Sequence, residues 1–222
     1  VQDTRNRIAR GSDAVTRHVA PPGGVATMTP ARRLKNILGG SAGNFVEWFD
    51  WFAYSAFAIS FSRALFPAGD QTAQLLGAAA IFAVGFIARP LGALLFGGYA
   101  DRAGRRTALT LSVAMMCGGS LMIALIPTGL GVLSPALLLV ARLLQGLSVG
   151  GEYGASATYI SEMAERTQRG FWSGFLYVTL TGGQLAALLL LVLLQRVLTE
   201  QQLYEWGWRI PFAVGAALAI IV

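Results

Sequence analysis

Six long apolar stretches follow one another from Asn36 to the end of the sequence, and they restrict the fold more than any other feature. They cover about residues 37–62, 74–98, 107–126, 133–158, 171–195 and 207–222. At about 1.5 Å of helix per residue, each of the first five is long enough to cross about 30 Å of hydrocarbon. Hydrophobic residues make up 55% of the chain and charged residues 13%, unlike an ordinary soluble domain. The sequence therefore predicts an all-α membrane protein.

The two ends of the sequence predict a fragment. The sixth apolar stretch continues to Val222 without a polar flank, so we expect the chain to stop within its sixth span. Residues 1–30 are polar and lack the apolar core of a secretory signal, which favours a disordered basic segment or upstream read-through before Met28. Residues 31–222 are expected to form one bundle of six transmembrane helices.

The net charge of +6 reflects membrane topology. Basic residues concentrate before the first span and in the links between spans two and three and between spans four and five: Arg32, Arg33, Lys35, Arg102, Arg105, Arg106, Arg166 and Arg169. The opposite loops contribute only Arg63 and Arg196, with Arg209 at the edge of span six. The positive-inside rule predicts a cytoplasmic N-terminus, and this placement of charge argues against nucleic acid as a partner.

Two acids, Glu47 and Asp50, stand near the middle of the first span. An ionised side chain at the bilayer centre costs at least about 2.5 kcal/mol on insertion scales, so such groups usually face a partner or a water-filled cavity. Gly43, Glu47, Asp50 and Tyr54 follow at steps of four, three and four residues, which places them on one helical face. Counted from Asn36, the acids lie about 16 and 20 Å deep. We expect both to face basic groups, with either acid able to carry a proton.

Span two supplies a base at a similar depth. Arg89 lies about 18 Å from Asp101 at the cytoplasmic end of the span. Pro90 follows it and removes a backbone hydrogen bond, which leaves a carbonyl that is tolerated beside protein or water. We expect Arg89 to face a cavity and to pair with Glu47, with Asp50 or with an anionic substrate. A buried structural ion pair is the alternative, because burial often cancels the Coulomb gain of such pairs.

Spans four and five complete the candidate substrate site. Arg142, Gln145 and Glu152 share one face of span four, and Arg142 is the second candidate contact for an anion. An adjoining surface of small residues, Gly146, Gly150, Gly151 and Gly154, predicts close helix packing. The residues expected to line the substrate site are Tyr54, Arg89, Arg142, Gln145, Glu152, Tyr153, Tyr177 and Gln184.

The segment GGYADRAGRR joins spans two and three. Gly97 and Gly98 permit close backbone approach, and Gly104 suits a turn conformation closed to residues with a β-carbon. The segment resembles the signature loop of the major facilitator superfamily, matched by Gly97, Asp101, Arg102, Gly104, Arg105 and Arg106, with Tyr99 in place of an aliphatic residue. The resemblance implies that this loop, through these six residues, controls the switch between outward-open and inward-open states. Separately, Glu162 at the cytoplasmic end of span four is expected to pair with Arg105 or Arg106. A plain positive-inside anchor is the alternative.

Four further segments narrow the assignment. GNFVEWFDWFAYS, FIARPLGALLFGGYADRAGRR, RLLQGLSVGGEYGASATYISEMAERTQRG and WGWRIPF are similar to parts of the metabolite:proton symporter family, which includes α-ketoglutarate, citrate, shikimate and proline/betaine permeases. That family has twelve spans, so the chain would hold the N-terminal six and lack the C-terminal six-helix half. The resemblance implies a secondary transporter of the bacterial inner membrane that moves a small organic acid or zwitterion with protons by alternating access.

The residues suggest how proton and solute would be coupled. We expect protonation of Glu47 or Asp50 to loosen its hold on Arg89, which then captures a substrate carboxylate. An intramembrane hydrolase is disfavoured, because both acids lie on one helix, whereas an acid dyad normally draws on two elements. A non-transporting receptor on a transporter fold remains an alternative. No metal or other cofactor is implied, since His18 and Cys117 are the only residues of their kinds.

Overall fold

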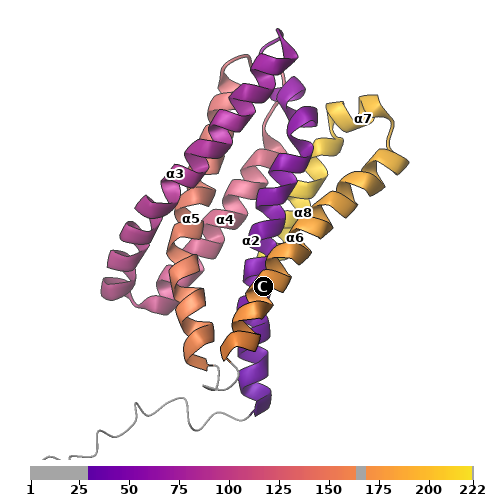
Figure 1. The fold of residues 1–222 in the computed structure, drawn as a ribbon. Coiled ribbons are helices and arrows are strands. Elements are labelled where there is room, and N and C mark those ends of the chain that lie inside the picture. The colour runs from indigo at the N-terminus through magenta and orange to yellow at the C-terminus, as the bar shows by residue number, and fades with distance from the viewer. Residues whose placement is uncertain (1–29, 164–168, 222) are drawn as a thin grey trace, which may run out of the picture. The chain divides into compact units, whose positions relative to one another are not determined.

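A computed structural model of the chain describes residues 30–163 and 169–221, and it describes their side chains except at 30–40, 105, 106, 109, 152–163, 169–173, 175 and 176. The chain divides into two compact units, Val1–Leu34 and Lys35–Val222. The described elements of the chain are, in order, α2 (Pro30–Leu65), α3 (Gln71–Ala103), α4 (Arg105–Leu125), α5 (Leu133–Met163), α6 (Arg169–Val197), α7 (Glu200–Glu205), the 3-10 turn η1 (Gly207–Arg209) and α8 (Ile210–Ile221) (Figure 1).

Each of the six predicted apolar stretches is helical in the described part of the chain, which confirms the all-α expectation. Several helices extend past the apolar stretches, and a polar cap accounts for the start of α3. Asp70 accepts a hydrogen bond from the backbone N–H of Ala73 at 3.0 Å and so starts α3 before its first apolar residues. α3 also continues through Pro90 without ending.

The short helix α7 was not predicted. It begins after Thr199, whose hydroxyl accepts from the backbone N–H of Gln202 while the Gln202 side chain accepts from the backbone N–H of Thr199. This reciprocal arrangement is a capping box, which satisfies two backbone donors that the helix itself leaves unpaired. The spacing Thr-x-x-Gln, read in the polar segment 196–206, is the sequence signal for this helix.

Small residues bring the helix backbones into direct contact, as the glycine surface of span four predicted. α5 packs against α3 and α4, and α4 also packs against α8 (Figure 1). A β-carbon added at Gly146 would overlap the carbonyl oxygen of Gly85 on α3, and one at Gly150 would overlap that of Arg89. α6 approaches α2 in the same way, since a β-carbon at Gly183 of α6 would lie 2.8 Å from the carbonyl oxygen of Phe45 on α2.

The largest apolar core lies where the second half of α2 meets the end of α4 and the start of α8. Its bulky members include Phe57, Phe61, Ile123, Trp208 and Phe212. Large apolar side chains instead point outward along α3 and α6, including Ile87, Leu94, Leu95, Leu185 and Leu189. Outward apolar faces of this kind are suited to lipid contact.

Three helical segments in the described ranges are long and apolar enough to cross a membrane: Gln71–Ala103, Leu133–Gly151 and Tyr177–Val197. Two further apolar helices, Thr110–Leu125 and Gly207–Ile221, are shorter. α2 buries two acids, Glu47 at 2% exposure and Asp50 at 1% exposure.

Candidate functional site

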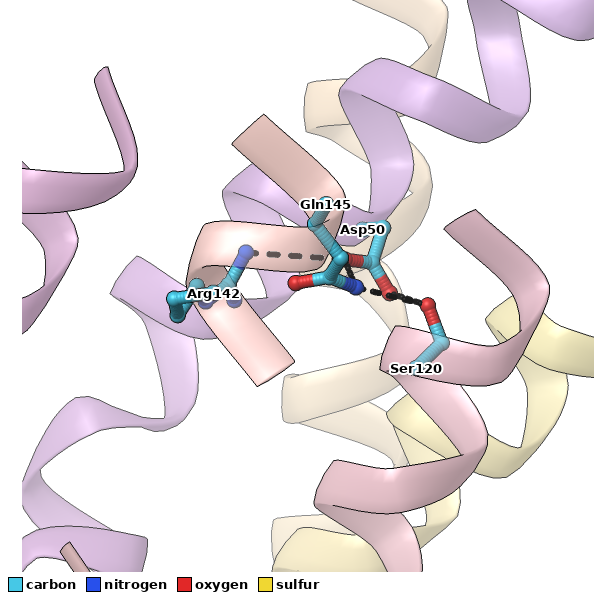
Figure 2. A network of polar contacts seen from close by, with 4 residues as sticks. All are labelled: Asp50, Ser120, Arg142 and Gln145. Carbon is cyan, nitrogen blue, oxygen red and sulfur yellow. Dashed lines mark hydrogen bonds and ion pairs between the residues drawn. The ribbon is translucent and has the colours of Figure 1, made fainter. Parts of the chain in front are cut away.

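Asp50 lies at the centre of a polar cluster that joins three helices (Figure 2). The hydroxyl of Ser120 on α4 donates a 2.7 Å hydrogen bond to Asp50 Oδ1, and the amide Nε2 of Gln145 on α5 donates a 2.6 Å bond to Oδ2. The guanidinium Nη1 of Arg142, also on α5, lies 3.6 Å from the same Oδ2. A buried carboxylate is therefore matched by two hydrogen-bond donors and one positive charge, which offset the cost of its removal from water.

Ser120 and Gln145 also contact each other, so the cluster closes into a ring. Gln145 Nε2 donates a second hydrogen bond, of 2.8 Å, to the oxygen of Ser120. Gln145 was predicted as a substrate contact, and Ser120 was not predicted at all. The available signal was weak: a small hydroxyl residue in an apolar span, beside Gly118 and Gly119.

Arg142 is fully buried and lies against two aromatic rings of α2. Its guanidinium carbon is 3.9 Å from the ring centroid of Tyr54 and 5.2 Å from that of Trp51. Such cation–π contacts stabilise a desolvated cation. Within the described part of the chain, no guanidinium nitrogen of Arg142 makes a hydrogen bond. A buried cation with open donors can receive an anion at low desolvation cost, because most of that cost has already been met on folding.

Arg89 on α3 also lies against aromatic rings, and one of them, Trp51, is shared with Arg142. Its guanidinium carbon lies 4.1 Å from the ring centroids of both Trp51 and Phe86, and 5.7 Å from that of Trp48. The ring of Trp51 thus contacts both arginines. The described ion pair of Asp50 is with Arg142. The sequence had offered Arg89 as a partner of Glu47 or of Asp50, and the pairing of Arg89 with Glu47 stays a prediction. The ring of Trp51, the residue after Asp50, also packs against Phe82 and Phe86 of α3.

The remaining predicted residues are placed as follows. Tyr54 contacts Arg142 with its ring, while its hydroxyl donates a 2.8 Å hydrogen bond to the carbonyl of Ala78 on α3. On α6, Tyr177 is 73% exposed and Gln184 is half-buried, and neither is among the described contacts of Asp50. The side chains of Glu152 and Tyr153 lie outside the described residues.

The loop after α3 has the turn that its glycine predicts. Gly104 has φ +89°, a conformation that residues with a β-carbon rarely adopt, and its N–H bonds to the carbonyl of Ala100. Asp101 and Arg102 are exposed, and the side chains of Arg105, Arg106 and Glu162 lie outside the described residues. The close backbone approach expected at Gly97 and Gly98 is not found among the described residues, since a β-carbon there would meet no atom within 4 Å. Both glycines lie on the open side of α3.

No group of three or more His, Cys, Asp or Glu side chains that could hold a metal ion occurs within the described ranges. The ring around Asp50 brings a buried carboxylate close to a buried cation. Protonation of Asp50 removes the negative charge that is paired with Arg142, and an incoming anion can take the place of that charge. Both steps, protonation of Asp50 and binding of an anion by Arg142, leave the covalent bonds of the bound anion unchanged.

Comparison with curated proteins finds relatives along most of this chain. Over 192 residues, 86% of this chain and 44% of the relative, the chain is 55% identical to the α-ketoglutarate permease of Escherichia coli (strain K12). It is 37% identical to the citrate-proton symporter of Salmonella typhi over 89% of this chain and 47% of the relative. It is 36% identical to the proline/betaine transporter of Escherichia coli (strain K12) over 84% of this chain and 38% of the relative. The chain thus spans less than half the length of these curated relatives.

Solved structures match the fold. A partially occluded inward-open form of the xylose transporter XylE from E. coli aligns with a TM-score of 0.73 at 22% identity, over 86% of this chain and 47% of that one. The expected fold class is confirmed: an all-α membrane protein with the N-terminal helix bundle of a major facilitator fold. The relatives are named as transporters and not as enzymes. Residues 37–222 match the family described as sugar (and other) transporter, and the chain belongs to that family of the major facilitator superfamily.

Proposed function

We propose that this chain forms half of a secondary transporter that carries a small organic acid with protons across the bacterial inner membrane by alternating access. The observation that carries the proposal is the buried ion pair between Asp50 on α2 and Arg142 on α5, 3.6 Å apart and both nearly inaccessible. Buried charges in a membrane domain are costly, and they usually mark a substrate path or a proton relay. The 55% identity to an α-ketoglutarate permease supports the choice of solute class.

The coupling follows from the competition for Arg142. While Asp50 is ionised, its carboxylate holds the guanidinium, and Ser120 and Gln145 hold the carboxylate. A proton on Asp50 removes that attraction, and the open donors of Arg142 are then available to a substrate carboxylate. Arg89, which shares the Trp51 ring, is the second proposed anion contact. A proton and an anion therefore enter the site together, which is the requirement for symport.

The described contacts of Asp50 support it as the proton carrier. Asp50 has the ion pair to an arginine on another helix, so its protonation alters a contact between α2 and α5. We assign Asp50 as the proton carrier and Glu47, one turn earlier on α2, as a charge that tunes the same cavity. The exposed loop with Asp101 and Arg102 is proposed as the conformational switch on the cytoplasmic side, together with Gly97, Gly104, Arg105, Arg106 and Glu162.

The test uses the full-length transporter in liposomes, with radiolabelled α-ketoglutarate as the solute and an imposed proton gradient. Asp50→Asn should abolish accumulation against a gradient but leave solute exchange at equal pH, since exchange needs no net proton transfer. Glu47→Gln should retain accumulation at a changed rate. Normal accumulation by Asp50→Asn would refute Asp50 as the proton carrier. Citrate, proline, betaine and shikimate, tested in parallel, distinguish an organic acid from a zwitterion, and binding without flux would indicate a receptor.

A further inference from the structure

The hydrogen bonds of the ring around Asp50 match an ionised acid. The ring contains three hydrogens: the Ser120 hydroxyl hydrogen points to Oδ1, and the two Gln145 amide hydrogens point to Oδ2 and to the Ser120 oxygen. A carboxylate accepts hydrogen bonds and donates none, so this arrangement satisfies it. A proton added at Oδ2 would face the amide hydrogen of Gln145 at a heavy-atom distance of 2.6 Å. One of the two groups must then turn.

The same amide carries the acceptor that a protonated Asp50 would need. Gln145 Oε1 is buried and has no hydrogen-bond partner among the described residues. A buried carbonyl oxygen without a hydrogen bond is costly. An amide orientation that leaves this oxygen unpaired is favoured only while the hydrogen bonds donated by the amide nitrogen stabilise it by more. Here the gain is the pair of donated bonds from Nε2. A half-turn of the amide would bring Oε1 to Asp50 and next to the Ser120 oxygen, and the Ser120 hydroxyl could then rotate to donate to Oε1.

We infer that Gln145 is a positioning residue whose amide reverses when Asp50 takes up a proton, and so converts that proton into the release of Arg142. With Asp50 ionised, Nε2 donates to Oδ2. With Asp50 protonated, the new O–H donates to Oε1, and the hydrogen that bridged Nε2 to Oδ2 turns away with the amide. The proton thus passes from water to Asp50 Oδ2 and stays there, and no bond other than O–H forms. This inference rests on the proposed function and gives Gln145 a task other than substrate contact.

Few other charges surround this switch. Arg142 is the nearest charge, and it lies on the same helix as Gln145, one turn earlier. Both side chains contact the same carboxylate oxygen, Asp50 Oδ2 (Figure 2). The titratable and charged groups around Asp50 on the described parts of the packed helices are Glu47 and Tyr54 on α2, Arg89 on α3, Cys117 on α4 and Arg142 on α5. α8 brings a glycine to the carboxylate, since a β-carbon at Gly215 would lie 3.0 Å from Asp50 Oδ1.

The test reads the amide directly by infrared difference spectroscopy. The full-length protein is labelled with ¹³C at the side-chain carbonyl of glutamine, and spectra are taken in acidic and alkaline buffer. The Gln145 band is identified by its loss in Gln145→Met, with Gln145→Asn as the second variant if Met prevents folding. The carboxylic-acid band of Asp50 is identified by its loss in Asp50→Ala. Gln74 is the matched control, because its side chain is also buried and its Nε2 donates to the carbonyl of Pro67 at 2.9 Å.

Acidification should move the Gln145 carbonyl band to lower frequency, as expected for a carbonyl that gains a hydrogen bond, with the same midpoint as the Asp50 acid band. The shift should be absent in Asp50→Ala, and the Gln74 band should not move. An Asp50 acid band that appears without a Gln145 shift, or no Asp50 band at any pH at which the protein stays folded, overturns the inference. The transport assay of Asp50→Asn is a separate readout, so the proposed function can fail while the amide switch stands, and the reverse.

Discussion

At the scale of single residues, the bond from Ser120 to Asp50 is the part of the site that the sequence did not reveal, and its strength can be measured. Ser120→Ala leaves Asp50 Oδ1 buried without its 2.7 Å donor. Hydrogen bonds to charged groups contribute about 1.5–3 kcal/mol, so the variant should unfold at a clearly lower temperature in detergent. Ser62→Ala is the matched control, because Ser62 is also buried but donates only to the carbonyl of Ile59 within its own helix, at 3.3 Å. Equal melting temperatures for the two variants would contradict this account of Ser120.

The sequence predicted which residues carry the site better than it predicted how they pair. Helical periodicity placed Asp50 on one face of α2 and placed Arg142 with Gln145 on one face of α5, because spacing within a helix fixes relative direction. It did not determine which neighbouring helix each face meets, and so Arg89 was offered as a partner of either acid, whereas the described ion pair of Asp50 is with Arg142. Ser120 was missed because a serine in an apolar span carries no charge and can also bond to its own backbone.

At the scale of the helices, the contact between α3 and α5 depends on glycine. A β-carbon at Gly150 would overlap the carbonyl oxygen of Arg89, and a backbone atom cannot move aside as a flexible side chain can. Overpacking of this kind costs about 1–3 kcal/mol, so Gly150→Ala should lower the melting temperature of the purified protein. Gly118 on α4 is the control, since no atom of the described residues would lie within 4 Å of a β-carbon at that position. Gly118→Ala should be neutral or stabilising by up to about 1 kcal/mol, as alanine favours helix. A stable Gly150→Ala variant would rule out the close approach.

The same helices show the limits of reading elements from hydropathy. All six apolar stretches form helices, because an apolar run of this length satisfies its backbone groups internally only as a helix in lipid. Their ends were predicted less well, since caps such as Asp70 and Thr199 decide where a helix begins, and the six-residue α7 has too little apolar content to register. Pro90 did not interrupt α3.

At the scale of the whole molecule, the distribution of basic residues predicts which side of the membrane each loop occupies. The loop at Gly104 and the loop between α4 and α5 lie at opposite ends of α4, which at 21 residues is about 30 Å long. Arg102, Arg105 and Arg106 surround the first loop, whereas the loop from 126 to 132 has no charged residue. The positive-inside rule therefore predicts that the Gly104 loop is cytoplasmic and that the other loop faces outward.

Single cysteines test this orientation. Cys117, the only cysteine of this chain, is first replaced by serine in a cysteine-free form of the full-length protein. Ala103→Cys and Thr128→Cys then each place one thiol at an exposed position, the first beside Gly104 and the second between α4 and α5. A membrane-impermeant maleimide should label Thr128→Cys in intact cells and should label Ala103→Cys only in inside-out vesicles. The two positions lie at opposite ends of one helix, so the reverse labelling pattern would show that the bundle has the opposite orientation. The Gly104 loop would then lie outside, and protons would have to enter from the side of Asp101 and Arg102.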